Sequence, residues 1–492
     1  MRVTGTRVDD PTTDVRRESS WVSLLWAALV WWVKVAARLV VWVVRAWTLT
    51  GPAALLALVW AWWGRLAALG VPLVGLLVLL VWWRRWPDRF ADLVVARVRG
   101  RWRWRTVYGW HWWSVMDGVG LTRKSPTHAV YVPTVVRVRS TRVVDRLDVR
   151  LLHGHTPQDV SAVAEGLRHS FGAHRCQVAE TGPGRVRVTF YARDPLLVPL
   201  PPVVPGEAVD MAALPVGLCE DGRPYLLRLA GTHLLIAGTT GAGKGSVLWS
   251  IIAALAPGIA EGSVRLRGAD PKGGMELFPG RALFTDYQDE SGGDIATMLE
   301  DAVADMNALK AKMKTAGLRA FKGSRAEPWN VIVVDELAVL TAYGDKDVAK
   351  RVKDAMSVLL SQGRAVGFIV IAALQDPSKD VLSFRDLLPT RVALRLMSES
   401  QAEMSLGDGA VARGARCHDI NPTLPGVGFV RIEGVIEPVR VRFTYLTDED
   451  IRALAAKYAA PCNVTGPGPD TVAGPVVEDR PAGLALAGQV AA

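Results

Sequence analysis

Apolar residues run almost unbroken through positions 21–83, and after that they recur in shorter periodic groups. The stretch 66–83 carries no charge and approaches the about 20 apolar residues that a membrane-spanning helix needs. A second span is expected at about 21–44, where Lys34 and Arg38 would be costly unless they are paired or reach the interface. The pattern predicts a cytoplasmic N-terminus at 1–20 and a transmembrane region of about two helices at 21–83.

A basic, tryptophan-rich segment follows at 84–123. Eight arginines and two aspartates lie in 84–105, and 17 of the 19 tryptophans fall between Trp21 and Trp113. Tryptophan prefers the headgroup layer, and positive flanks stay in the cytoplasm. We interpret this segment as a juxtamembrane helix. A secretory signal peptide or a nucleic-acid-stacking surface at 99–105 are alternatives that the pattern favours less.

Short alternating groups at 135–140, 145–152 and 185–192 predict strands of a small α/β domain at 124–197. Between them, Thr156 as N-cap, Pro157 and Asp159 predict a helix that continues to about His169. Four histidines at 153, 155, 169 and 174 lack acidic or cysteine partners, so the pattern favours surface histidines over a metal site. The proline-rich stretch 198–207 is interpreted as a stiff linker.

The strongest chemical signal is HLLIAGTTGAGKGSVLWSIIAALA at 233–256. An apolar strand leads into a glycine-rich loop, then Lys244, then an apolar helix. Glycines let backbone N–H groups surround phosphate oxygens, the lysine supplies a positive charge, and the helix N-terminus adds its dipole. The nucleotide-binding residues predicted from this loop are Gly238, Thr239, Thr240, Gly241, Ala242, Gly243, Lys244, Gly245 and Ser246.

A second motif, VIVVDE at 331–336, predicts a buried strand that ends in two acids. In phosphate-loop ATPases such a strand delivers an aspartate to Mg²⁺ and a glutamate to the attacking water. We expect Asp335 to serve as a metal ligand and Glu336 as the catalytic base, with ATP and Mg²⁺ as cofactors. A plain core strand that ends in a solvated pair is the alternative.

The position after the lysine departs from the usual pattern. A serine or threonine normally follows and binds Mg²⁺, but here Gly245 stands there and Ser246 comes next. One residue turns a helix by about 100°, so Ser246 replaces that hydroxyl only if the loop is reshaped. Ser246, a water, or a hydroxyl of Thr239 or Thr240 are the alternatives for the metal ligand.

Charge and cysteine content narrow the class of protein. The 492 residues carry a formal charge of +10, and residues 1–200 hold 28 basic and 13 acidic groups. The positive excess therefore lies at the front, where a membrane surface or polyanion would attract it. The four cysteines are widely separated, which argues against a zinc site and a disulfide framework.

The motifs at 206–445 together resemble the FtsK/SpoIIIE family of membrane-anchored DNA pumps. DPKGGMELF at 270–278, VIVVDELAVL at 331–340, GRAVGFIVIAALQDPS at 363–378 and LLPTRVALRL at 387–396 occur in that family's order. The GKGS variant is most similar to the subgroup carried by conjugative elements. The resemblance implies a RecA-like parallel sheet, a hexameric ring and a central channel for duplex DNA.

The resemblance also assigns roles to single residues. Gln375 corresponds to a polar sensor between the phosphate loop and the acidic strand. Arg364 and Arg391 occupy the family's arginine positions and are candidates for reaching a phosphate of the neighbouring subunit, with a plain salt bridge as the alternative for each. Asp270 and Lys272 gain no specific role from it. After the motor at 208–446, the sequence predicts one helix at 447–460 and a disordered tail at 461–492, with no room for a DNA-reading domain.

We therefore predict an inner-membrane, multi-pass ATPase whose cytoplasmic motor moves double-stranded DNA in conjugation. Its expected partners are duplex DNA, the membrane, other copies of itself in a hexamer, and a separate DNA-recognition protein. Chromosome segregation and type VII-like protein export are the alternatives. A non-hydrolysing scaffold is a third.

Overall fold

The computed structural model describes the chain in segments. They are 61–62, 64, 73–124, 130–203, 205–206, 208–342, 345–377, 384–435 and 437–461. The chain forms two compact units, one of Met1–Trp110 with Val138–Thr141 and one of His111–Arg137 with Arg142–Ala492. The predicted tail at 461–492 lies outside the described residues except for its first position.

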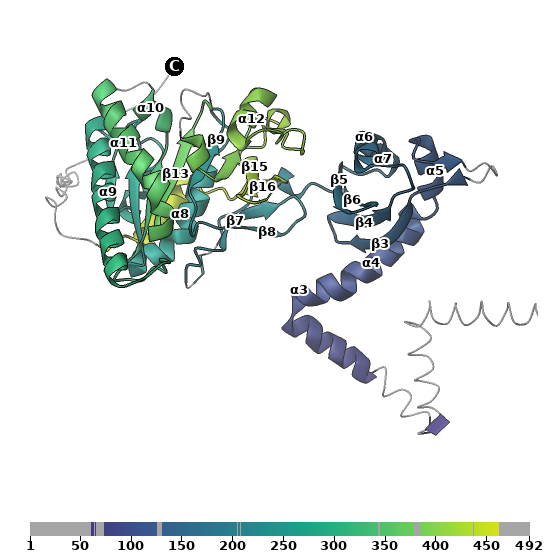
Figure 1. Cartoon of the computed structure of the whole chain (residues 1–492). Helices are drawn as coiled ribbons and strands as arrows, with labels where there is room; N and C mark the ends of the chain where they lie inside the picture. Colours follow the sequence, from purple (N-terminus) through teal and green to yellow (C-terminus); the bar gives the residue numbers. More distant parts are fainter. Residues whose placement is uncertain are drawn as a thin grey trace, which may run out of the picture. The chain divides into compact units, whose positions relative to one another are not determined.

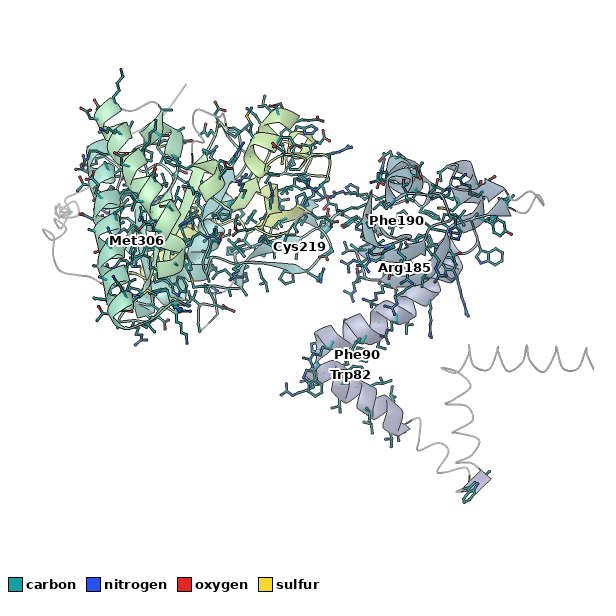
Figure 2. All side chains as sticks on the ribbon, viewed as in Figure 1. Trp82, Phe90, Arg185, Phe190, Cys219 and Met306 are labelled. Atoms are coloured by element: carbon teal, nitrogen blue, oxygen red, sulfur yellow. The ribbon has the colours of Figure 1, made fainter. Side chains whose placement is uncertain are left out.

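The first unit contains a bent helical segment. Residues 73–85 are helical, Trp86 interrupts the helix, and a new one starts at Pro87, where a proline is favourable because its missing N–H needs no partner. Figure 2 shows Trp82 and Phe90 facing each other at this bend, with ring centroids 5.6 Å apart and an edge-on angle of 88°. The second arm consists of α3 (Pro87–Phe90), η1 (Ala91–Val95), α4 (Ala96–Arg103) and η2 (Trp104–Tyr108).

The predicted membrane spans fall largely outside the described residues. The first span, at about 21–44, lies wholly outside them, and only 73–83 of the second span is described. Across the described segments, no helix combines the length and the hydropathy that a bilayer crossing requires. The transmembrane hairpin therefore stays a prediction.

The small domain is an α+β structure. It contains α5 (Trp112–Gly118), the short pair β1 (Arg123–Lys124) and β2 (Val130–Tyr131), and a sheet in the order β3-β4-β6-β5. The strands of that sheet are β3 (Thr134–Ser140), β4 (Val144–Arg150), β5 (Arg175–Gly182) and β6 (Arg185–Tyr191), and β6 runs antiparallel to both neighbours.

The helix predicted after Thr156 forms as two pieces. They are α6 (Pro157–Ala162) and α7 (Ala164–Ser170), and Val163 between them leaves helical geometry at φ −99° and ψ 8°. Thr156 and Asp159 form the reciprocal capping box, so the predicted start is confirmed. The three strands predicted for this domain omitted a fourth, β5. Polar and apolar residues alternate only over the first four positions of β5, because Val178 and Ala179 are both apolar, and its burial does not alternate either.

The motor contains a ten-stranded mixed sheet in the order β11-β10-β12-β13-β9-β14-β15-β16-β7-β8. The parallel part consists of β11 (Asp286–Gln288), β10 (Val264–Ala269), β12 (Trp329–Val334), β13 (Phe368–Leu374), β9 (Leu234–Ala237) and β14 (Thr390–Ala393). The antiparallel part consists of β15 (Val427–Arg431), β16 (Val439–Phe443), β7 (Leu214–Cys219) and β8 (Pro224–Leu227). The α/β prediction is confirmed, and the parallel sheet carries an antiparallel extension.

Helices cover both faces of this sheet because its central strands are apolar on both sides. In β9, Leu234 and Ile236 pack with α8 (Lys244–Glu261), while Leu235 and Ala237 pack with α9 (Gly292–Thr315) and α11 (Lys346–Gln362). Figure 1 shows α9 and α11 side by side. The remaining helices are α10 (Leu337–Thr341), α12 (Glu399–Leu406) and α13 (Asp448–Lys457). Thr447 caps α13, as the sequence predicted.

Short helical turns connect several of these elements. They are η3 (Pro195–Leu197), η4 (Phe278–Leu283), η5 (Gly363–Val366), η6 (Arg385–Leu387) and η7 (Cys417–Asp419).

The parallel strands place the ends of several loops together. Because β9, β10, β12 and β13 are parallel, the loop that follows β9 lies at the same edge of the sheet as the carboxyl ends of the other three strands.

Candidate nucleotide site

The glycine-rich loop has the geometry that its residues require. Gly241 and Gly243 have φ values of 72° and 94°, in the left-handed region that side chains disfavour. A Cβ on Gly243 would also lie 2.2 Å from the backbone nitrogen of Gly426. The helix α8 then starts at Lys244, so its free backbone N–H groups point into the loop.

Neighbouring strands hold the rest of the loop in place. The Thr239 backbone N–H donates to the Arg395 carbonyl over 3.0 Å, and its hydroxyl donates to the same oxygen over 3.2 Å. The Gly426 N–H donates to the Ala242 carbonyl over 2.9 Å. Every predicted loop residue from Gly238 to Ser246 therefore lies in or directly after this turn, which is anchored before a nucleotide arrives.

Lys244 and the two acids lie together at this edge. The Lys244 ammonium donates to the Gly238 carbonyl over 3.0 Å. Asp335 and Glu336 directly follow β12 and are only 5% and 3% exposed. Burial lowers the pKa of Lys244, although Glu336 and Asp335 oppose that effect. The structure thus brings the predicted lysine, aspartate and glutamate into one electrostatic cluster.

Gln375 connects the glycine-rich loop after β9 to the acidic end of β12. It follows β13, the strand that lies between β9 and β12 in the sheet. The Thr240 hydroxyl donates to its side-chain oxygen over 3.1 Å, and its backbone N–H donates to Glu336 Oε1 over 3.1 Å. Gln375 therefore lies between the phosphate loop and the acidic strand, and its role as a sensor stays a prediction.

Three residues of the DPKGGMELF motif complete the cluster, and the sequence had assigned none of them a role. Lys272 Nζ donates to Glu336 Oε2 over 3.0 Å and lies 3.8 Å from Asp335 Oδ2. Asp270 is fully buried and accepts from the backbone N–H groups of Lys272, Glu276 and Leu277. The sequence signal that could have identified them is the placement of this charged motif directly after β10, because β10 pairs in parallel with β12 and the two strands end at the same edge of the sheet.

Burial makes the negative charges in this cluster expensive. It raises the pKa of Asp335 to about 6, even though Lys272 acts in the opposite direction. It also raises the pKa of Glu276 to about 7, with Asp335 and Asp270 adding to the effect. These carboxyl groups therefore lie where additional positive charge would be stabilising.

The donor set fits a magnesium ion that is shared with a nucleotide. Four carboxylates, of Asp270, Glu276, Asp335 and Glu336, are accompanied by the two ammonium groups of Lys244 and Lys272, which leaves a negative excess when all are ionised. Within the described part of the chain, no three His, Cys, Asp or Glu side chains enclose a metal on their own. Mg²⁺ in nucleotide sites typically takes only one or two carboxylates, together with phosphates and water.

Arg364 and Arg391 lie away from the loop of their own subunit. Arg364 precedes β13, where its Nε donates to the Gly231 carbonyl and its Nη2 lies 2.5 Å from Glu433 Oε2. Arg391 is mostly buried and donates to the carbonyls of Leu388 and Arg385 over 2.9 and 2.8 Å. Neither joins the cluster around Lys244, and their role toward a neighbouring subunit stays a prediction.

Known families match both folded parts of the chain. Residues 80–192 match the actinomycete conjugal transfer protein N-terminal domain, and residues 207–421 match the FtsK/SpoIIIE family. Transfer protein TraSA of Streptomyces ambofaciens is 30% identical over 330 residues, which cover 60% of this chain and 78% of TraSA. The chain belongs to the FtsK/SpoIIIE family, in its conjugative transfer subgroup.

More distant members of the FtsK/SpoIIIE family are longer than this chain. DNA translocase FtsK of Shewanella oneidensis is 26% identical over 386 residues, which cover 67% of this chain and 39% of that protein. The chain thus matches about two fifths of the length of FtsK. The solved structure of the pCW3 conjugation coupling protein TcpA, a monomer with ATPγS, is 17% identical and covers 70% of this chain and 97% of TcpA, with a TM-score of 0.48.

Proposed function

We propose that this chain is a membrane-anchored ATPase that moves double-stranded DNA during conjugative transfer. The observation that carries the proposal is the convergence of Lys244, Gln375 and Glu336 at one edge of the sheet. Conjugal transfer and DNA translocation are what the related proteins are named for.

Each residue of the site has a role in ATP hydrolysis. Backbone N–H groups of the loop and the N-terminus of α8 would hold the phosphates, and Lys244 would leave the Gly238 carbonyl to pair with their charge. Glu336 would orient and deprotonate the attacking water, and Gln375 would report the state of the phosphate to Glu336 through its backbone N–H. A bound Mg²⁺, held with the help of Asp335, would offset charge on the phosphates.

Charge and exposure support the proposed membrane anchor. The described residues 73–83 are helical and expose large apolar side chains, with Val78 and Val81 60% and 61% exposed. Exposed apolar surface of this extent is typical of contact with lipid or protein. Eight arginines in 84–105 follow it directly, which would keep the motor in the cytoplasm.

The proposed assembly is a homo-hexamer around duplex DNA, with sequence choice left to a separate protein. In such a ring Arg364 or Arg391 would reach the phosphates of the neighbouring subunit. Contacts to the DNA backbone would then dominate binding, so affinity would fall steeply with salt.

The direct test is ATP turnover by the full chain in detergent, with and without linear duplex DNA. We expect duplex DNA to stimulate turnover. Lys244→Ala and Glu336→Gln should each lower the stimulated rate by at least about 100-fold, because one removes the phosphate contact and the other the base. A turnover that ignores duplex DNA would instead favour protein export, and ATP binding without turnover would favour a scaffold.

A further inference from the structure

Position 245 has no side chain, and a carboxylate fills the space beside it. An ideal Cβ built on Gly245 would lie 2.0 Å from Glu276 Oε1, 2.9 Å from its Cδ and 3.3 Å from Oε2. A serine or threonine at 245 would therefore displace the Glu276 carboxylate from this position. The missing hydroxyl and the acid at 276 are two parts of one local arrangement.

The backbone of Glu276 is fixed from two sides. Its N–H and that of Leu277 both donate to Asp270 Oδ2 over 3.0 Å, and Asp270 follows β10. Its carbonyl accepts from Trp249 Nε1 on α8 over 3.3 Å. These contacts hold the backbone of Glu276 beside the first turns of α8, within reach of position 245 for its side chain.

The Glu276 carboxylate has no donor of its own. Asp270 is satisfied by backbone N–H groups, and Glu336 by Lys272. In the segments that the structure describes, Glu276 accepts no hydrogen bond with its side chain and forms no ion pair. A half-buried carboxylate next to a phosphate loop is costly unless a cation accompanies it. The Ser246 side chain lies on the side of the turn that faces Gly426, where a Cβ built on Gly426 would meet its Oγ at 3.5 Å.

We propose that Glu276 supplies the Mg²⁺ ligand that serine or threonine supplies in other phosphate loops. This inference rests on the proposed ATP site and extends it to a residue 31 positions away from the loop. The carboxylate replaces a neutral hydroxyl with a charged oxygen ligand, which Mg²⁺ prefers. The metal would then be tied to the segment after β10 as well as to Asp335 after β12.

The test compares metal-dependent and metal-free nucleotide binding in the full chain. Metal-free binding is measured by titrating a fluorescent, non-hydrolysable ATP analogue in the presence of excess EDTA. Metal binding is measured by titrating Mn²⁺ with that analogue bound and following it by electron paramagnetic resonance. Glu276→Gln should weaken Mn²⁺ binding by about 10–100-fold. It should not weaken the metal-free affinity for the analogue, because the neutral amide removes a negative charge that opposes the phosphates.

A swap of the two positions provides the second arm. Gly245→Ser alone should disturb the loop, whereas Gly245→Ser combined with Glu276→Ala should recover Mn²⁺ affinity above that of Glu276→Ala alone. Glu290→Gln, an exposed acid after β11, is the matched control and should change neither affinity.

The outcomes separate this inference from the proposed function. Wild-type Mn²⁺ affinity in Glu276→Gln, or no recovery in the double variant, would overturn the role of Glu276 while the ATP site stands. A wild-type chain that binds the analogue neither with nor without Mn²⁺ would overturn both.

Discussion

Lys272 is an internal counter-ion of the active site. Its ammonium lies 3.0 Å from Glu336 and 3.8 Å from Asp335, two buried acids that would otherwise face each other without compensation. An ion pair in water contributes little attraction. Here both acids are nearly inaccessible to water, so the ammonium of Lys272 attracts them far more strongly than it would attract acids on the surface. Glu336, the proposed catalytic base, is therefore paired with a lysine from the segment that follows β10.

The proposed role of Arg364 toward a neighbouring subunit can be separated from its ion pair. Arg364 and Glu433 are 40% and 57% exposed, so their pair contributes at most about 1 kcal/mol to stability. Arg364→Ala and Glu433→Ala should therefore each shift the free energy of unfolding only slightly, with the larger shift in Arg364→Ala because it also loses the hydrogen bond to the Gly231 carbonyl. Only Arg364→Ala should lower DNA-stimulated ATP turnover, by about 1,000-fold. Equal ATP turnover in both variants would contradict a role of Arg364 at the phosphates of a neighbouring subunit.

At the scale of elements, His233 connects the strand of the phosphate loop to its neighbours. It precedes β9 and is fully buried. Its Nδ1 accepts from the Val370 N–H in β13 over 3.1 Å, and its Nε2 lies 3.1 Å from the Leu360 carbonyl in α11, which can only accept. The ring is thus a neutral link between three elements that carry the site.

This link makes stability depend on pH. Burial lowers the pKa of His233 from 6.5 to about 4, so the unfolded chain binds a proton between these values and the folded chain does not. The stabilisation is complete above pH 6.5 and is lost as the pH falls toward 4, by about 3 kcal/mol in total. Urea unfolding at pH 7.5 and 5 should show a larger loss for wild type than for His233→Gln. Equal losses would contradict this account.

The elements that the sequence predicted well are those whose pattern is local. Apolar runs with defined ends predicted β9 and β12, and Thr156 with Pro157 and Asp159 predicted the start of α6. In contrast, β5 has no regular alternation, and the Glu276–Gly245 contact joins residues 31 positions apart. Neither has a signature at fixed spacing. Nothing in the sequence of β15 and β16 predicted that they would pair antiparallel beside β14.

At the scale of the whole molecule, charge and chemistry are separated along the chain. The basic excess lies in residues 1–200, and the ATP site is built wholly from residues of 208–446, which together are slightly acidic. The front of the chain therefore carries the expected attraction for lipid headgroups, and the motor is not a broadly basic surface. This separation agrees with DNA contacts that are confined to particular loops of a channel.

The central claim is that ATP hydrolysis at this site drives movement along duplex DNA. The most direct measurement is displacement of a third strand bound to linear duplex, by the full chain with Mg²⁺ and ATP. The account predicts displacement that needs ATP hydrolysis and is absent in Lys244→Ala. A chain that hydrolyses ATP in response to duplex DNA, yet never displaces the third strand, would contradict it.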